Sequence, residues 1–128
     1  MKEKLQKLLE NSYSPYSKFP VASIVVMKDG KEFVGVNVED ATTRAGTCAE
    51  RSAIFAAISN GYKKHDFEKI YVMSNNDKII MPCFVCRQMF VELFEKETKV
   101  IAMNPAGDTK EHTVAELCPY PFDESDLV

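Results

Sequence analysis

The sequence predicts an α/β domain in which helices pack on a mixed β-sheet, and two observations predict this class. Two apolar, β-branched segments, residues 21–27 and 32–38, flank a short polar turn and should pair antiparallel. Residues 69–74, 82–96 and 99–104 then follow in the order strand, helix, strand, which places the two strands parallel through a right-handed connection. We therefore expect a mixed sheet within a three-layer α/β/α sandwich.

The remaining elements follow from local patterns. Leucines at helical spacing among charged residues predict an amphipathic surface helix over residues 2–11. Residues 14–20 contain two prolines and should form an extended loop. The turn at residues 28–31 contains Asp-Gly, which is typical of a type I′ hairpin. Residues 48–59 are rich in alanine and predict a buried helix, and residues 82–96 a second one with proline near its first turn.

The size and composition of the chain are those of a single globular domain spanning residues 1–128. No apolar run approaches the roughly 20 residues that would span a bilayer, and the N-terminal segment lacks the features of a secretory signal. We expect a soluble, cytoplasmic protein without a membrane partner. The 16 Lys and Arg residues are scattered and the net charge is −3, so a nucleic-acid partner is not expected.

Four cysteines in a cytoplasmic chain indicate metal binding or catalysis rather than disulfides. Cys83 and Cys86 form a CxxC pair at the start of a predicted helix, and Cys48 begins the other predicted helix. Two helix N-termini favour thiolates, and three protein ligands leave a fourth zinc position open, as in catalytic sites. Cys118 would be the fourth ligand of a closed structural site, but it falls in a predicted C-terminal turn and is more typical of a small buried residue.

Glu50 lies two residues after Cys48 and is our candidate general acid and base. A carboxylate beside a zinc-bound water can take up its proton and pass it on, which is the chemistry of hydrolysis. The same residue also fits a structural role, because Thr47-x-x-Glu50 matches a helix capping box. We favour catalysis for Glu50 and keep Thr47 as a candidate cap by itself. His65 and His112 lie in polar segments that we expect to be solvated loops.

Two motifs in this order resemble the homotetrameric, zinc-dependent cytidine deaminases. The motifs are Cys48-Ala49-Glu50-Arg51 and Pro82-Cys83-Phe84-Val85-Cys86-Arg87-Gln88. Further similar blocks are residues 13–21, 35–39 and 116–119, so the resemblance covers nearly the whole chain. Zinc deaminases use a Cys₃ or His/Cys/Cys zinc, an attacking water and a glutamate that does not bind the metal.

The resemblance implies one Zn²⁺ per subunit and a reaction in pyrimidine salvage. Cys48, Cys83 and Cys86 would hold the zinc, a zinc-bound hydroxide would attack C4 of cytosine, and Glu50 would move protons, converting cytidine or deoxycytidine into uridine or deoxyuridine and ammonia. Arg51 would offset the net charge of about −1 that three thiolates leave on the zinc. The implied substrate-binding residues are Phe19, Asn37, Glu39 and Ala49, together with Phe122 from a neighbouring subunit of a homotetramer.

The chain departs from the family pattern at Met81, Phe84, Asp40 and Thr42-Thr43, which should affect specificity or assembly more than zinc chemistry. Two alternatives therefore stay open. One is a deaminase of another aminopyrimidine nucleoside, such as the antibiotic blasticidin S. The other is a non-catalytic zinc-binding interaction module, in which Glu50 would have no function.

Overall fold

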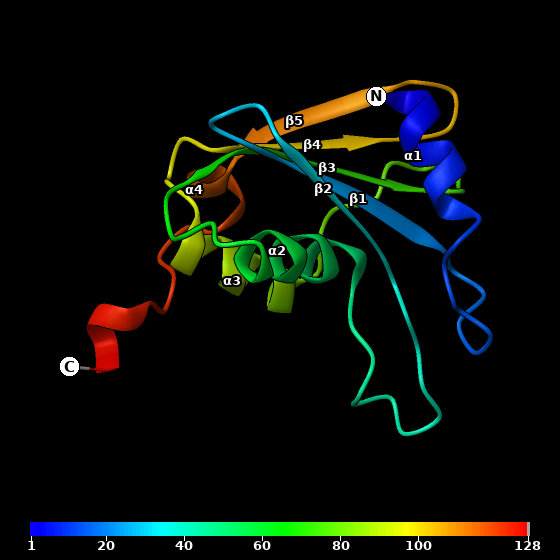
Figure 1. Cartoon of the computed structure of the whole chain (residues 1–128), viewed down its shortest axis with the longest axis horizontal. Helices are drawn as coiled ribbons and strands as arrows, with labels where there is room; N and C mark the ends of the chain where they lie inside the picture. The colour runs from blue at the N-terminus through cyan, green and yellow to red at the C-terminus, as the bar shows by residue number, and fades with distance from the viewer. Residues whose placement is uncertain (128) are drawn as a thin grey trace.

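A computed structural model of the chain describes residues 1–127, which fold around a five-stranded sheet of order β2-β1-β3-β4-β5 (Figure 1). The strands are β1 (Val21–Met27), β2 (Glu32–Val36), β3 (Phe67–Ser74), β4 (Lys99–Met103) and β5 (Thr109–Thr113). Strand β1 is antiparallel to β2 and β3, β3 is parallel to β4, and β4 is antiparallel to β5. The predicted mixed sheet, with its hairpin and its strand–helix–strand unit, is confirmed.

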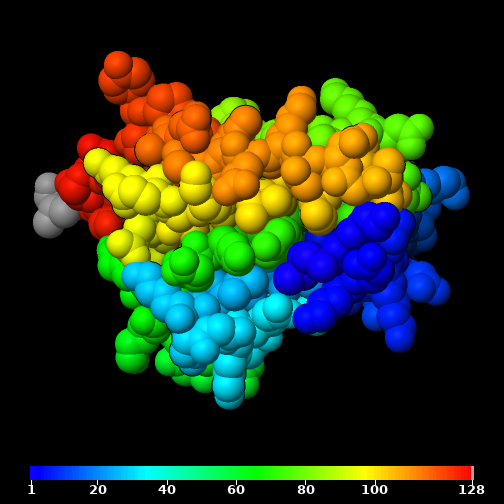
Figure 2. Space-filling view, turned by 90° about the horizontal axis from the view of Figure 1, so that it is seen from above, coloured from blue at the N-terminus to red at the C-terminus, as the bar shows by residue number. Residues whose placement is uncertain are grey.

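Helices cover both faces of this sheet, which confirms the three-layer α/β/α arrangement. Helix α1 (Lys2–Leu9) lies on one face, and helices α2 (Ala49–Ser59) and α3 (Phe84–Leu93) lie on the other (Figure 1). Figure 2 looks onto the α1 face and shows α1 over one end of it. The short helix α4 (Val114–Leu117) and a 3₁₀ helix (Glu124–Leu127) complete the described chain. Within residues 1–127, no helix has the length and apolar character needed to cross a membrane.

Each face of the sheet has its own hydrophobic core because successive side chains of a strand point to opposite faces. On β1, Ala22 and Ile24 pack with Leu5 of α1, whereas Val25 and Met27 point to the α2 and α3 side. The larger core lies on that second side and includes Ile54, Phe67, Phe90, Phe94 and Val100, all buried. Most of the buried apolar residues of these two cores therefore lie between the sheet and the layer of α2 and α3.

Three local predictions were wrong in detail. The hairpin turn is not type I′, because Gly30 alone among residues 28–31 has a positive φ, of 92°, whereas a type I′ turn needs two such residues. The Gly30 amide donates to the Met27 carbonyl, as in a three-residue loop with a bulge. The second predicted helix runs over Phe84–Leu93 rather than residues 82–96, so Cys83 is its N-cap. The polar segment around His112, expected as a loop, forms strand β5, whose exposed side chains lack the apolar alternation of half-buried strands.

Candidate active site

Three sulfur atoms gather where helices α2 and α3 begin. The Sγ atoms of Cys48, Cys83 and Cys86 lie within 4.8 Å of one another, and Cys83 is 3.6 Å from both Cys48 and Cys86. Two thiolates bound at about 2.3 Å to one tetrahedral zinc would be about 3.8 Å apart. Two of the three sulfur pairs have nearly this separation, so the three side chains form a candidate site for a single zinc ion, as predicted from their spacing. Cys118 does not join them, since its Sγ contacts the Arg87 carbonyl at 3.7 Å, so the closed Cys₄ alternative is wrong.

The two helix starts share one backbone geometry. Cys48 is the N-cap of α2 with φ −74° and ψ 157°, and Cys83 is the N-cap of α3 with φ −67° and ψ 163°. An N-cap residue in this extended conformation turns its side chain toward the free amides of the first helical turn. Both cysteines are thus presented at the positive ends of two helix dipoles, which stabilise thiolates.

Hydrogen bonding within the cluster separates the protonation states of its sulfurs. The bonds from Cys86, Arg51 and Cys83 lower the pKa of Cys48 to about 5, against an opposing effect of burial. The bond to Cys48 and burial raise the pKa of Cys86. In the metal-free protein Cys48 is therefore the sulfur that loses its proton most readily, and binding a divalent metal would release the remaining thiol protons.

Arg51 lies beside the cysteines, as predicted. Its Nη2 donates to Cys48 Sγ at 3.3 Å, so its positive charge compensates the thiolate directly. Its Nε is buried and has no hydrogen-bond acceptor among residues 1–127. A guanidinium that is held this closely against the sulfurs reduces the negative charge of a three-thiolate site.

Glu50, in the first turn of α2, is only 3% exposed. Burial raises the pKa of its carboxyl group to about 7, which suits a group that exchanges protons at neutral pH. The capping-box alternative is wrong, because the N-cap is Cys48 and not Thr47. Thr47 does not cap the helix by itself either, since its hydroxyl lies 3.5 Å from the Cys48 carbonyl.

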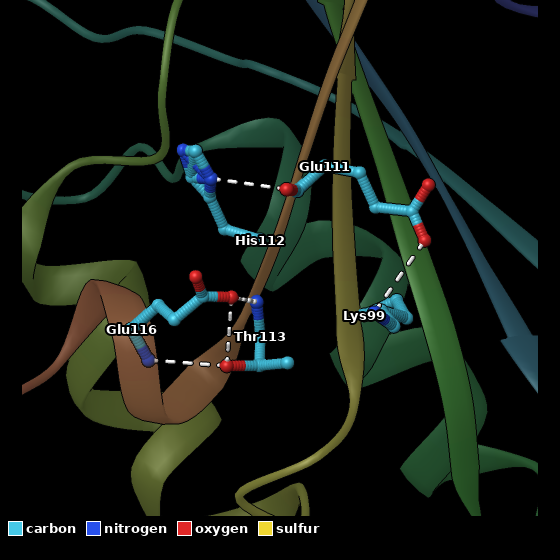
Figure 3. A network of polar contacts seen from close by, with 5 residues as sticks. All are labelled: Lys99, Glu111, His112, Thr113 and Glu116. Atoms are coloured by element: carbon cyan, nitrogen blue, oxygen red, sulfur yellow. Dashed lines mark hydrogen bonds and ion pairs between the residues drawn. The ribbon is translucent and has the colours of Figure 1, made fainter.

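The same Thr-x-x-Glu pattern forms a capping box elsewhere, at the start of α4 (Figure 3). Thr113 Oγ1 accepts from the Glu116 amide at 3.2 Å, and Glu116 Oε1 accepts from the Thr113 amide at 2.8 Å. On the opposite side of β5 in Figure 3, Lys99 and Glu111 form an ion pair at 3.8 Å. The carboxylate of Glu116 therefore has a structural role in a helix cap, whereas the buried carboxyl group of Glu50 takes no part in a cap.

A cleft of about 330 Å³ opens next to the cysteine cluster, within the range of small-molecule sites. Its lining residues include Cys48 and Arg51 from the start of α2, and Asn37 and Glu39 from the segment that follows β2. Glu39 Oε1 accepts from the amides of Tyr16 and Ser17 at 3.0 and 3.1 Å. The cleft thus has in its lining both Cys48 of the sulfur cluster and two residues that the family resemblance implied for substrate binding.

Asn37 connects the cleft to the loop before β1. Its Oδ1 accepts from the amide of Val21 at 2.9 Å and from Ser12 Oγ at 2.5 Å, and its Nδ2 donates to the Phe19 carbonyl at 2.8 Å. Sequence analysis did not identify Ser12 or the amides of Tyr16 and Ser17 as supports of this site. Hydrogen bonds from the two backbone amides leave no mark on residue identity beyond the proline-containing loop that carries them, and Ser12 lies before that loop.

The other predicted site residues lie in three different places. Ala49 is buried as the first residue of α2, between Cys48 and Glu50. Phe19 is half-buried beside Asn37 but is not among the residues that line the cleft. Phe122 is 57% exposed in the C-terminal segment, where its carbonyl accepts from Gln88 Nε2 at 2.6 Å, and it does not line the cleft of its own chain. Phe84 is 75% exposed and stacks on Arg87.

Comparison with known proteins agrees with this geometry. The chain is 41% identical over 118 residues to the cytidine deaminase of Halalkalibacterium halodurans, covering 92% of this chain and 88% of that protein. It is 28% identical to the blasticidin-S deaminase of Bacillus cereus, covering 94% and 85%. The crystal structure of cytidine deaminase from Burkholderia pseudomallei superposes with a TM-score of 0.89 at 38% identity, covering 94% of each chain. Residues 1–103 match the family described as the cytidine and deoxycytidylate deaminase zinc-binding region, and the chain belongs to that family.

Proposed function

We propose that the chain, acting as one domain over residues 1–128, is a zinc-dependent enzyme that hydrolyses cytidine or deoxycytidine to uridine or deoxyuridine and ammonia. One observation carries this proposal. Three cysteine sulfurs with the spacing of zinc ligands gather beside a cleft that Cys48 lines and that is large enough for a small molecule, and the buried carboxyl group of Glu50 follows Cys48 by two residues. Membership of the deaminase family and the similarity to cytidine deaminases support it.

Cys48, Cys83 and Cys86 would hold the zinc, since soft thiolates at this spacing match its preferred ligands and geometry. A zinc ion in this site supplies an electrophilic centre and lowers the pKa of a bound water molecule. Arg51 keeps the three-thiolate site from becoming too electron-rich by donating to Cys48. The two helix N-termini add to the same effect, because their positive ends point at the sulfurs.

Glu50 is the proton carrier of the proposed reaction. It would take one proton from the attacking water and deliver it to N3 of cytosine, and then pass the proton of the new C4 hydroxyl to the departing amine, so that the C4–N4 bond breaks, a C4 carbonyl forms and ammonia leaves. A pKa of about 7 allows the carboxyl group both to accept and to donate a proton near neutral pH. Its burial keeps bulk water from competing for these transfers.

The nucleoside would lie along the cleft, with the base at the cysteine end and the sugar at Asn37 and Glu39. Ala49 would adjoin the base, and Phe19 would flank the ring or the sugar from the loop that Asn37 fastens. The hydroxyl of Ser17 lowers the pKa of Glu39 by hydrogen bonding, which keeps this residue an ionised acceptor for sugar hydroxyls. A site that pairs with a substrate hydroxyl discriminates strongly against analogues that lack it.

We infer a homotetramer in which Phe122 closes the cleft of a neighbouring subunit. Phe122 is exposed in its own chain and outside its own cleft, and Phe84, Val85 and Tyr120 are exposed as well. Exposed aromatic and aliphatic residues of this kind are typical of subunit contacts. Light scattering on the purified protein tests the tetramer, and Phe122→Ala should reduce turnover if the neighbour's cleft needs it.

We also infer that the protein works in the cytoplasm. The three clustered cysteines are free thiols, and a reducing compartment keeps such thiols available as metal ligands. Fractionation of cells that produce the full-length protein, followed by immunoblotting, checks the location.

A spectrophotometric assay with cytidine and deoxycytidine on purified protein, run beside a zinc measurement, tests the function. We expect one zinc per chain and turnover of one or both nucleosides. Turnover of blasticidin S with neither nucleoside accepted would favour the alternative substrate. A tightly bound zinc with no deamination of any aminopyrimidine nucleoside would favour the interaction module and refute the enzyme.

A further inference from the structure

Helix α2 and strand β2 touch at Gly35 without any side chain between them. A Cβ atom at this position would lie 2.5 Å from the carbonyl oxygen of Ala49 and 2.4 Å from the amide nitrogen of Ala53. Both are backbone atoms of α2, so no side-chain rotation can relieve the contact. The φ of Gly35 is not positive, and the need for glycine is therefore one of space and not of backbone conformation.

This contact lies between the two segments from which the lining residues of the cleft come. Asn37 and Glu39 follow Gly35 in the chain by two and four residues, whereas Ala49 is flanked by Cys48 and Glu50. A second backbone connection lies nearby, because Val38 and Thr47 form an antiparallel bridge with N–O distances of 3.0 and 2.9 Å. The segment that carries Asn37 and Glu39 and the segment that carries Cys48 and Glu50 are thus in contact through backbone atoms at two points.

Gly46 adjoins the second of these points. A Cβ atom at Gly46 would lie 2.1 Å from the Val38 carbonyl oxygen, and its φ is not positive either. The bridge between Val38 and Thr47 therefore also depends on a missing side chain. Two glycines allow β2 and the segment after it, which carries Asn37 and Glu39, to approach helix α2 and the residues before it.

We infer that Gly35 is a positioning residue, which sets the separation between the sugar-binding residues Asn37 and Glu39 and the cysteine and Glu50 end of the cleft. The inference rests on the proposed function, because it takes the cleft to hold a nucleoside that spans both ends. Added bulk at Gly35 moves α2 away from β2. A nucleoside then engages one end at the expense of the other, and displacements of about 1 Å can lower a rate by about 10²-fold.

The test compares nucleosides with and without sugar hydroxyls. In Gly35→Ala, we expect the preference for cytidine over 2′,3′-dideoxycytidine, measured as a ratio of kcat/KM, to fall at least about tenfold, since only cytidine needs both ends aligned. Zinc content should stay at the wild-type level. Calorimetric titration with uridine and 2′,3′-dideoxyuridine provides a readout independent of turnover, and the preference for uridine should fall to a similar extent.

Ile54→Val is the matched control, because it removes a buried methyl group from the same helix without adding an atom against β2. It should lower thermal stability and keep both preferences. Gly46→Ala is a second, independent variant that presses on Val38 from the loop, and it should also lower the preferences. All variants are compared as the folded, zinc-containing fraction from gel filtration.

The outcomes separate this inference from the proposed function. A wild-type protein that deaminates no cytidine, or that does not prefer cytidine over its dideoxy analogue, contradicts the proposed function and overturns the inference with it. A wild-type protein with that preference, combined with Gly35→Ala and Gly46→Ala variants that keep it, overturns the inference alone. A preference lost in both glycine variants and kept in Ile54→Val supports Gly35 as the residue that aligns the two ends.

Discussion

Replacing Glu50 by glutamine removes the charge of a buried carboxyl group and keeps its size, so the variant separates a catalytic role from a structural one. Burial raises the pKa of Glu50 from 4.5 to about 7. Each pKa unit corresponds to about 1.4 kcal/mol, so the ionised carboxylate destabilises the metal-free fold by about 3 kcal/mol. Because the folded value is the higher one, this destabilisation is absent below pH 4.5 and develops fully above about pH 7.

Glu50→Gln should therefore gain about 3 kcal/mol in unfolding free energy at about pH 8 and almost nothing at pH 4.5, measured by urea denaturation of the chelator-treated protein. The zinc-loaded variant should retain its metal and lose at least about 10²-fold in kcat. Glu116→Gln is the control, because this carboxylate belongs to a capping box that glutamine can also form, so it should change stability little at either pH and keep normal turnover. Unchanged turnover in Glu50→Gln, or a loss of stability at both pH values, would refute the assignment.

Three further substitutions test other parts of the site and fold. Arg51→Ala should retain part of its zinc and lose about 10-fold or more in kcat, because Cys48 loses its charged donor. Zinc content and kcat are both measured, and full activity in this variant would exclude a role for Arg51 in compensating the charge of the thiolates. Thr113→Ala should lower the unfolding free energy by about 1 kcal/mol with kcat unchanged, whereas Thr109→Ala on the same strand should have a smaller effect. Glu39→Gln should raise KM for cytidine more than it lowers kcat. Hydrogen bonding lowers the pKa of Glu39, so its contribution to stability is present above pH 4.5 and is lost on acidification. A Glu39→Gln variant whose stability depends on pH in the same way as that of the wild type would contradict this.

The two Thr-x-x-Glu segments show where local patterns stop being sufficient. Both match a capping box, yet only the segment at Thr113 forms one. At Thr47 the N-cap is instead the next residue, Cys48, and the glutamate is then buried in the first turn rather than turned back to the helix end. Which residue becomes the N-cap depends on how the chain enters the helix. Here the bridge between Thr47 and Val38, which are nine positions apart in the chain, fixes the backbone immediately before the N-cap.

Hydrophobic periodicity and turn signals were sufficient for the hairpin, the strand–helix–strand unit and the two helices that carry the cysteines. They were not sufficient for β5, because the polar residues of Thr109–Thr113 become a strand only by hydrogen bonding to β4. The turn type also escaped prediction, since Asp-Gly occurs in more than one kind of hairpin loop. Local sequence thus predicted elements that bury an apolar face, and missed those that depend on a partner strand.

The identity of the candidate ligands came from the sequence alone, because three cysteines and one glutamate at these spacings already indicate a zinc site with an open position. Only the tertiary structure brought the sulfur of Cys83 to 3.6 Å from those of Cys48 and Cys86 and buried Glu50 to 3% exposure. It alone also placed Gly35 against the backbone of α2. The physical reason is that residue type determines which chemistry is available, whereas distance, burial and pKa depend on the packing of segments that are far apart in the chain.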